Sequence, residues 1–155
     1  MVDAAMAVGE GEITIKPVPV KSRMSFLPKN FGAQFMLAER YLFDMANRCI
    51  PKEQYSGYFH YEYINYADGA KAPLLRHSTD EQIEFTNLFG RTEIVSSRCA
   101  SAILTTLVLI RLIESGRISE KLHDMFCDQY YLLFEAGREF ARQDGCSREF
   151  FNLTD

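Results

Sequence analysis

The chain has 155 residues, 47% of them hydrophobic and 13% aromatic, which is enough for one compact core and short for two. Its 17 basic and 21 acidic residues are scattered without blocks and give a net charge of -4, which argues against long-range attraction to nucleic acid. The four cysteines form no Cys-x-x-Cys pair, which argues against a disulfide framework and favours reduced thiols in a cytosol.

The start of the chain has neither a basic n-region nor a continuous apolar stretch. We expect residues 1–11 to be a flexible tail rather than a signal peptide or an anchor, and residues 12–155 to form a single domain. The longest apolar run, residues 102–110, is far shorter than the ~20 residues that span a bilayer, so it predicts a core helix. These features predict a cytoplasmic protein that does not bind a membrane.

The first predicted elements are an extended arm and a helix. Residues 12–20 place isoleucines at alternate positions, but Pro17 and Pro19 cannot donate to a β-ladder, so we expect an edge strand or an extended arm. Residues 34–49 carry apolar side chains at spacings of three and four. This spacing predicts a helix that ends before Pro51.

The middle of the chain has the period of β-strands. Residues 57–66 are rich in aromatics that recur at every second position, which predicts a strand. An Asp-Gly pair follows, and Gly69 suits a type I′ turn that returns the chain along residues 70–75 as a hairpin. Pro73 places that returning strand at an edge of the sheet. Residues 82–89 predict a third antiparallel strand, with a short helix as the alternative.

Three helices are predicted in the last third of the chain. Ser97 is expected to cap a helix that runs to about Glu114 and is apolar nearly all the way round, which is typical of a central, buried helix. Ser119 can cap a longer helix that ends near Gly145, and Ser147 can cap a short last one. Together the elements predict an α+β fold in which a small three-stranded antiparallel sheet is packed by about four helices, one of them central and buried.

The sequence carries no complete catalytic motif, since it lacks a P-loop, a Gly-x-Ser-x-Gly and a His-Glu-x-x-His. His123 and Cys127 have the i, i+4 spacing of metal ligands, but two ligands are half a site, and a partly buried histidine beside a core cysteine is the ordinary explanation. A nucleophilic Cys49, Cys99 or Cys146 would need a base that the sequence does not identify. We therefore predict a protein that is not an enzyme, with no catalytic residue, cofactor or metal.

Charged clusters give little support for a nucleic-acid partner. The densest acidic cluster is explained by a solvated turn before a strand (Asp80, Glu81 and Glu84), and the nearest basic footprint by a solvated helix face (Arg138, Arg142 and Arg148). DNA mimicry needs about 20 ordered negative charges for ~10 base pairs, since a duplex carries one charge per ~1.7 Å. A net charge of -4 is far smaller, so we expect neither stable DNA binding nor DNA mimicry.

The aromatic strand has more rings than a half-buried strand needs. Two explanations stand with equal weight. The tyrosines between Tyr58 and Tyr66 could form a partner surface, or helices could cover one face of the strand while the N-terminal arm covers the other.

Several segments of the chain match known motifs in a fixed order. Residues 23–32 (RMSFLPKNFG) follow an Arg-x-Ser-Phe-x-Pro-x-x-Phe-Gly pattern, and residues 55–57 follow the start of a Tyr-x-Gly-Gly-x-Trp pattern. In these segments the chain resembles the KlcA/ArdB antirestriction family. Ala72-Pro73, the helix start at residues 96–103 and the spacing from Phe140 to Asp155 are also similar. The chain departs from the family pattern in three places. The second glycine is absent after Gly57, Phe59 stands in place of Trp, and residues 66–68 (Tyr-Ala-Asp) replace an Asn-Gly-Gly turn.

The resemblance implies an α+β fold and relief of type I restriction of incoming DNA. A protein without a catalytic centre or mimicry would act by occupying a protein surface, with an apolar centre and a polar rim. The implied partner is the host type I restriction-modification complex or an associated host protein, in the cytoplasm of a bacterial host, and a weak homo-oligomer is a further expectation. The predicted partner-binding residues are Phe31, Tyr55, Phe59, Tyr61 and Asp155.

Two alternative functions remain. Because the chain departs from the family at Phe59 and at residues 66–68, it could inhibit another defence nuclease, such as a CRISPR effector. It could also be a small thiol-dependent or metal-dependent enzyme that uses Cys49, or His123 with Cys127.

The last helix is expected to place Asp155 at a functional surface.

Overall fold

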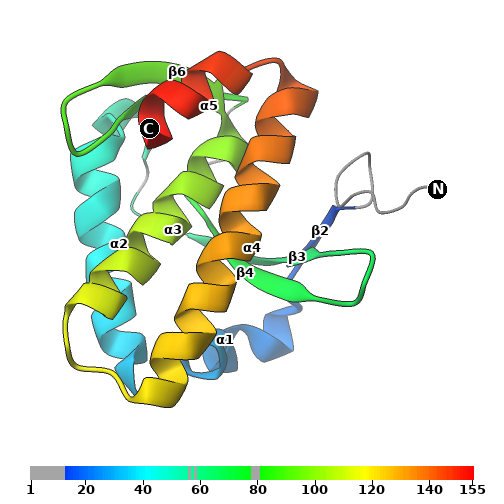
Figure 1. Ribbon diagram of the computed structural model, residues 1–155, viewed down its shortest axis with the longest axis vertical. Coiled ribbons are helices and arrows are strands. Elements are labelled where there is room, and N and C mark those ends of the chain that lie inside the picture. Colours follow the sequence, from blue (N-terminus) through cyan, green and yellow to red (C-terminus); the bar gives the residue numbers. More distant parts are fainter. Residues whose placement is uncertain (1–12, 56, 58, 78–80) are drawn as a thin grey trace.

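The computed structural model describes residues 13–55, 57, 59–77 and 81–155, and the predicted tail of residues 1–11 lies outside this range. Figure 1 shows long helices side by side, a small sheet beside them and a second hairpin near one end. The five α-helices of the described residues are α1 (Arg23–Phe31), α2 (Phe35–Cys49), α3 (Ser97–Glu114), α4 (Glu120–Asp144) and α5 (Ser147–Thr154). Short 3-10 turns lie at Val20–Ser22, Gly32–Gln34 and Lys52–Gln54.

The main sheet is antiparallel and has three strands in the order β2 (Thr14–Pro17), β3 (His60–Asn65) and β4 (Lys71–Arg76). The α+β class with a three-stranded antiparallel sheet is thereby confirmed. Both predicted hairpin strands are present, and β4 with Pro73 lies at an edge as expected. Gly69 has a positive φ of 92°, but it is the fourth residue of a turn that begins at Tyr66, so the predicted type I′ turn is wrong.

The third strand of this sheet is the N-terminal arm rather than residues 82–89. Thr14 pairs with Asn65 and Pro17 with Glu62, so the arm takes the second edge of the sheet, where a proline is tolerated. Residues 82–86 do form a strand, β5 (Gln82–Thr86), but it pairs with β6 (Thr92–Ser96) in a separate two-stranded sheet. The sequence did not indicate β6.

Helix α3 lies between α2 and α4 in Figure 1, and it is the central, buried helix that the sequence predicted. Twelve of its 18 residues are buried, on all its faces, and it packs on α2, α4 and β4. Its N-cap is Ser96, whose hydroxyl accepts a hydrogen bond from the backbone N–H of Cys99, and Ser97 is the first helical residue. The predicted cap was therefore one residue late.

Helix α4 follows the prediction closely. The hydroxyl of Ser119 accepts the backbone N–H of Leu122, and Gly145 ends the helix in the left-handed conformation with a φ of 76°. Helix α2 also matches its prediction and ends at Cys49. The last helix is present, but its N-cap residue is Cys146 without a side-chain cap, so Ser147 does not cap it.

Helix α1 was not predicted. It contains Pro28 in its interior, where a proline removes one backbone hydrogen bond, and Gly32 is its C-cap. A Cβ atom on Gly32 would lie 3.0 Å from Leu122 Cδ2, and its φ is 61°, so glycine suits this close approach of α1 to α4. Over the described residues, the helices are too short or too polar for any of them to cross a membrane.

Candidate functional site

The last helix and the β5–β6 turn meet at one end of the molecule and enclose an apolar cleft. Phe150 and Leu153 of α5 are buried, with 1% and 5% of their surfaces exposed, and they hold the helix on the core. The cleft between α3, α4, α5 and the turn has a volume of about 190 Å³. We define the apolar cleft by the residues that line it: Asn87, Leu88, Phe89, Ile103, Thr106, Leu107, Ile110, Tyr130, Phe134, Leu153, Thr154 and Asp155.

The turn presents two large apolar side chains to solvent at the rim of this cleft. Phe89 is 93% exposed and Leu88 is 48% exposed. Next to them on α4, Tyr130 lines the cleft and lies edge to face with Tyr131, which is 71% exposed. Scattered exposed apolar residues are ordinary, but several of them around an apolar hollow are typical of a protein-binding surface.

Polar contacts, rather than burial, hold the turn in place. The Asn87 side-chain oxygen accepts the backbone N–H groups of Phe89 and Arg91, at 3.0 and 2.9 Å. Its side-chain nitrogen donates to the Leu153 carbonyl at 3.0 Å, and Asn152 donates to Glu93 at 3.1 Å. These hydrogen bonds join the backbone of the turn to α5, and a backbone that is already held in place lowers the entropic cost of binding a partner.

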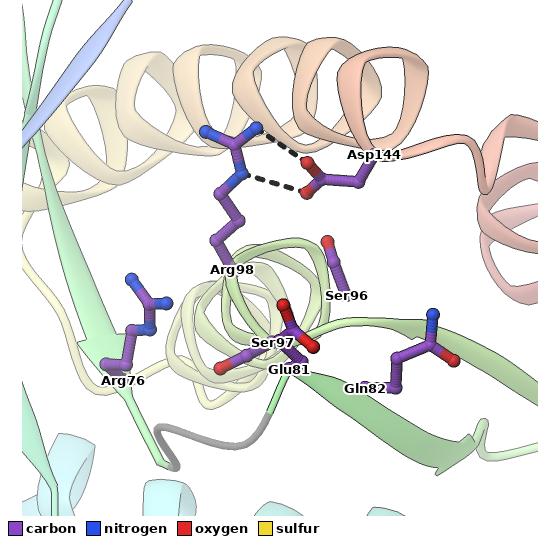
Figure 2. Close-up of a pocket in the computed structure, with 7 residues that line it drawn as sticks. All are labelled: Arg76, Glu81, Gln82, Ser96, Ser97, Arg98 and Asp144. Atoms are coloured by element: carbon purple, nitrogen blue, oxygen red, sulfur yellow. Dashed lines mark hydrogen bonds and ion pairs between the residues drawn. The ribbon is translucent and has the colours of Figure 1, made fainter.

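A second hollow, of about 350 Å³, is polar and lies where α3 begins (Figure 2). In it the Arg98 guanidinium donates two hydrogen bonds to the Asp144 carboxylate, at 2.8 and 2.9 Å, and its face lies 4.7 Å from the Phe140 ring. Arg76 is paired with Glu62 at 3.3 Å. These charges are paired with one another, so we interpret this hollow as the place where α3 is fixed to the end of α4.

The Arg98 contact also sets the pKa of Asp144. Hydrogen bonds from Arg98 lower the pKa of this carboxyl below its ordinary value, although partial burial opposes them. A carboxylate with a lowered pKa stays ionised at neutral pH and cannot serve as a general acid there. The two hydrogen bonds from Arg98, which join α3 to the end of α4, give Asp144 a structural function.

The cysteines differ from one another in acidity. Burial raises the pKa of Cys49 to about 11, so its thiol is a poor nucleophile. Hydrogen bonding to Cys146, together with burial, raises the pKa of Cys99. Hydrogen bonds from Cys99 and Ser96 lower the pKa of Cys146 to about 6, although burial opposes them. With 7% of its surface exposed, Cys146 offers little room for a substrate.

The proposed metal pair is not joined by further ligands in the part of the chain that the structure describes. The Cys127 sulfur lies 3.9 Å from His123 Nδ1, and His123 also lies 3.7 Å from an Asp124 carboxylate oxygen. Within residues 13–55, 57, 59–77 and 81–155, three or more His, Cys, Asp or Glu side chains nowhere converge as a metal site would require. Of the acidic cluster, Asp80 lies outside the described residues, while Glu81 lines the polar hollow.

The five predicted partner-binding residues do not form one surface. Phe31 is fully buried against Phe126, with ring centroids 6.1 Å apart, so its function in this structure is packing. Tyr61 stacks on Phe26 at 4.7 Å, so α1 covers that side of the aromatic strand. The expectation that helices cover one face of the strand is therefore met on this side. The expectation that the N-terminal arm covers the other face is wrong, because the arm pairs with the edge of β3 in the plane of the sheet.

The other three residues lie in two places. Tyr55 and Phe59 lie together, 5.6 Å apart, and Phe59 also contacts Phe43 of α2. Asp155 follows α5 and lines the apolar cleft. The sequence analysis did not identify Leu88 and Phe89 as candidate binding residues. A signal was present, because turns normally carry polar residues and these two large apolar residues stand between Asn87 and Gly90.

Comparison with known proteins identifies relatives. No protein-family model matches the chain. The Escherichia coli K12 protein YubI, named as a candidate antirestriction protein, is 35% identical over 100 residues, which cover 62% of this chain and 67% of YubI. The chain belongs to the KlcA/ArdB-type antirestriction family.

A solved structure agrees with this assignment at the level of the fold. It comes from a study of the KlcA and ArdB proteins, described as having a novel fold and antirestriction activity against type I DNA restriction systems in vivo but not in vitro. The TM-score is 0.65, with 22% sequence identity over 94% of this chain and 99% of that one. At this identity the likeness supports the KlcA/ArdB fold.

Proposed function

We propose that this protein relieves type I restriction of incoming mobile-element DNA by binding a host protein through the apolar cleft. Membership of the antirestriction family supports the biological activity. The observation that carries the mechanism is the Leu88–Phe89 pair, which is exposed to solvent at the rim of an apolar hollow, in a turn whose backbone is hydrogen-bonded to the Asn87 side chain.

The cleft also indicates what the partner must offer. Its walls are apolar, so an apolar side chain of the partner would gain free energy by filling it and by covering Phe89. Asp155 lies at the rim with an exposed carboxylate, which favours a cationic group of the partner beside that apolar side chain. We therefore propose a partner surface in which an apolar anchor lies next to a lysine or an arginine.

The partner is the host restriction-modification complex or a host protein associated with it. The solved KlcA and ArdB proteins act in vivo but not in vitro, which favours an associated host protein as the partner, because a test of restriction in vitro contains the restriction complex itself. Binding without catalysis agrees with the Arg98–Asp144 ion pair in the polar hollow and with the enclosed Cys146 thiol.

Transformation with unmodified plasmid tests the activity. Hosts with and without a type I restriction system are compared, each with and without this protein. We expect the protein to raise the transformation efficiency of the restricting host only. Equal restriction with and without the protein, across several type I systems, would refute the proposal, and protection only against a CRISPR effector would move the activity to a different nuclease.

A further inference from the structure

A groove beside the main sheet brings together three lysines from distant parts of the sequence. It lies between the sheet and the start of α1 and has a volume of about 450 Å³. Lys16 comes from β2, Lys29 from α1 and Lys71 from β4. We call this the lysine groove. It does not share a lining residue with the apolar cleft.

Strand register places these lysines on one face of the sheet. Lys16 pairs with Tyr63, and Lys71 pairs with Asn65 two positions further along β3. Residues paired across strands share a face, and so do residues i and i+2 of one strand, so all four side chains project from the same face. The ring of Phe26 lies 5.2 Å from that of Tyr63, which shows that α1 covers this face and that Lys29 closes the groove.

The positive charge of the groove is not neutralised within the described part of the protein. Over these residues, the groove is lined by no carboxylate, and none of its three ammonium groups forms an ion pair. Lys71 lies 4.8 Å above the ring of Tyr63, which holds its charge over the groove. Three like charges around one hollow repel one another, and an anion between them would relieve that repulsion.

Three lysines in one groove are more than the acidic composition of the chain would suggest. The protein has a net charge of -4 and only six lysines (Lys16, Lys21, Lys29, Lys52, Lys71 and Lys121), yet three of the six line this one groove. A random solvated face would mix both signs of charge.

The type of cation and the size of the groove indicate the ligand. Planar carboxylates are recognised best by bidentate arginine, whereas lysine binds phosphate as a point charge, and this groove has lysines without an arginine. Its volume falls within the range of small-molecule sites, about 300–1,000 Å³. Val18 and Phe26 add apolar walls, and the Tyr63 hydroxyl, which accepts a hydrogen bond from Asn30 at 2.8 Å, still has its own hydrogen to donate.

We propose that the lysine groove binds a small ligand that carries two or three linked phosphate groups, such as a nucleoside polyphosphate. Three ammonium groups match the charge of such a ligand, and the apolar walls can hold the group attached to the phosphates. The compact groove and the acidic balance of the whole chain favour a small ligand over a long nucleic acid.

Calorimetric titration of the full chain tests this, with inorganic tripolyphosphate and ATP as separate probes. A triple variant, Lys16→Gln with Lys29→Gln and Lys71→Gln, removes the groove charges. The matched control is Lys21→Gln with Lys52→Gln and Lys121→Gln, which lowers the net charge equally at three exposed lysines outside the groove. Circular dichroism confirms that both variants fold.

We expect the wild type and the control to bind both probes with similar affinity, weakening as salt increases, and the groove variant to bind at least about tenfold more weakly. Tighter binding of ATP than of tripolyphosphate would show that the apolar walls contribute. No binding to the wild type, or an equal loss in both variants, would overturn the proposal. Binding of a single-stranded oligonucleotide through these lysines, with neither small probe bound, would also overturn it in favour of a nucleic acid.

Discussion

Phe150 of α5 lies directly against Gly137 of α4. A Cβ atom on Gly137 would be 2.9 Å from Phe150 Cε1 and 3.3 Å from the Ala102 Cβ atom on α3. The ring of Phe150 also contacts that of Phe134, with centroids 5.4 Å apart. This contact fixes α5, and α5 in turn supports one side of the apolar cleft.

Gly137→Ala should therefore destabilise the protein despite the better helix propensity of alanine. The propensity gain is about 1 kcal/mol, whereas overpacking a tight core costs about 1–3 kcal/mol. We expect a net loss of about 1 kcal/mol in the free energy of unfolding, measured by urea denaturation. In the Phe150→Leu background, where a smaller side chain faces Gly137, the Gly137→Ala substitution should cost less free energy of unfolding than it does in the wild type. Additive losses in this double-mutant cycle would show that the two residues do not compete for space.

Phe150→Ala should cost about 3–5 kcal/mol in the free energy of unfolding, because the side chain is 1% exposed and its removal leaves a cavity. Phe151, next in the helix and 48% exposed, supplies the control. Phe151→Ala should cost much less. If the two substitutions proved equally mild, α5 would not be docked on the core as described.

The Arg98–Asp144 pair should make stability depend on pH in the acid range. The pKa of Asp144 is lowered from 3.8 in the folded protein, so the pair stabilises the fold above pH 3.8, and this contribution disappears as the pH falls through the folded-state pKa. Asp144→Asn should cost about 1 kcal/mol near neutral pH, a modest value because the side chain is 25% exposed.

Urea denaturation of wild type and Asp144→Asn at several pH values measures this difference. The difference in the free energy of unfolding between wild type and Asp144→Asn should become smaller below pH 3.8. Asp128→Asn, at an exposed carboxylate of the same helix, should show a smaller gap near neutral pH. A gap for Asp144→Asn that stayed constant into strong acid would show that the ion pair is not its cause.

The elements predicted with the correct type are those whose periodicity agrees with their burial. Helix α3 is apolar nearly all round and 12 of its 18 residues are buried, and α4 carries an apolar stripe between a serine cap and a left-handed glycine. Helix α1 was missed because Pro28 in its interior argues locally against a helix. It forms nevertheless, because Phe26 and Phe31 are buried against the sheet and α4.

Strand pairing and the functional surface could not be predicted in the same way. The register that places Lys16 and Lys71 on one face depends on contacts between residues far apart in sequence. The strand β5 was predicted, but its partner β6 has only two clearly apolar residues, Ile94 and Val95, and gives little periodic signal. The exposure of Phe89 depends on hydrogen bonds of Asn87, which an apolar pattern does not reveal.

Asp155→Ala should separate packing from function. The residue follows α5 and its carboxylate is exposed, so we expect the melting temperature to stay within about 2 °C of the wild type. Its position on the apolar cleft predicts weaker antirestriction in the transformation assay. Glu53→Ala removes an exposed carboxylate elsewhere and should leave protection unchanged. Full activity of Asp155→Ala would show that the carboxylate is only the solvated end of a helix.

The central claim is that a protein partner binds the surface around Phe89, and Phe89→Ala in the antirestriction assay tests it most directly. Phe89 is 93% exposed, so its loss should leave the melting temperature unchanged. Met24→Ala is the control, because Met24 is 95% exposed and lies on α1, at the opposite end of the molecule from α5 and β6 (Figure 1). We predict that Phe89→Ala reduces protection of unmodified DNA at least about tenfold, a loss of about 1.4 kcal/mol in partner binding, while Met24→Ala protects like the wild type. Full protection by Phe89→Ala, or an equal loss with Met24→Ala, would contradict the account.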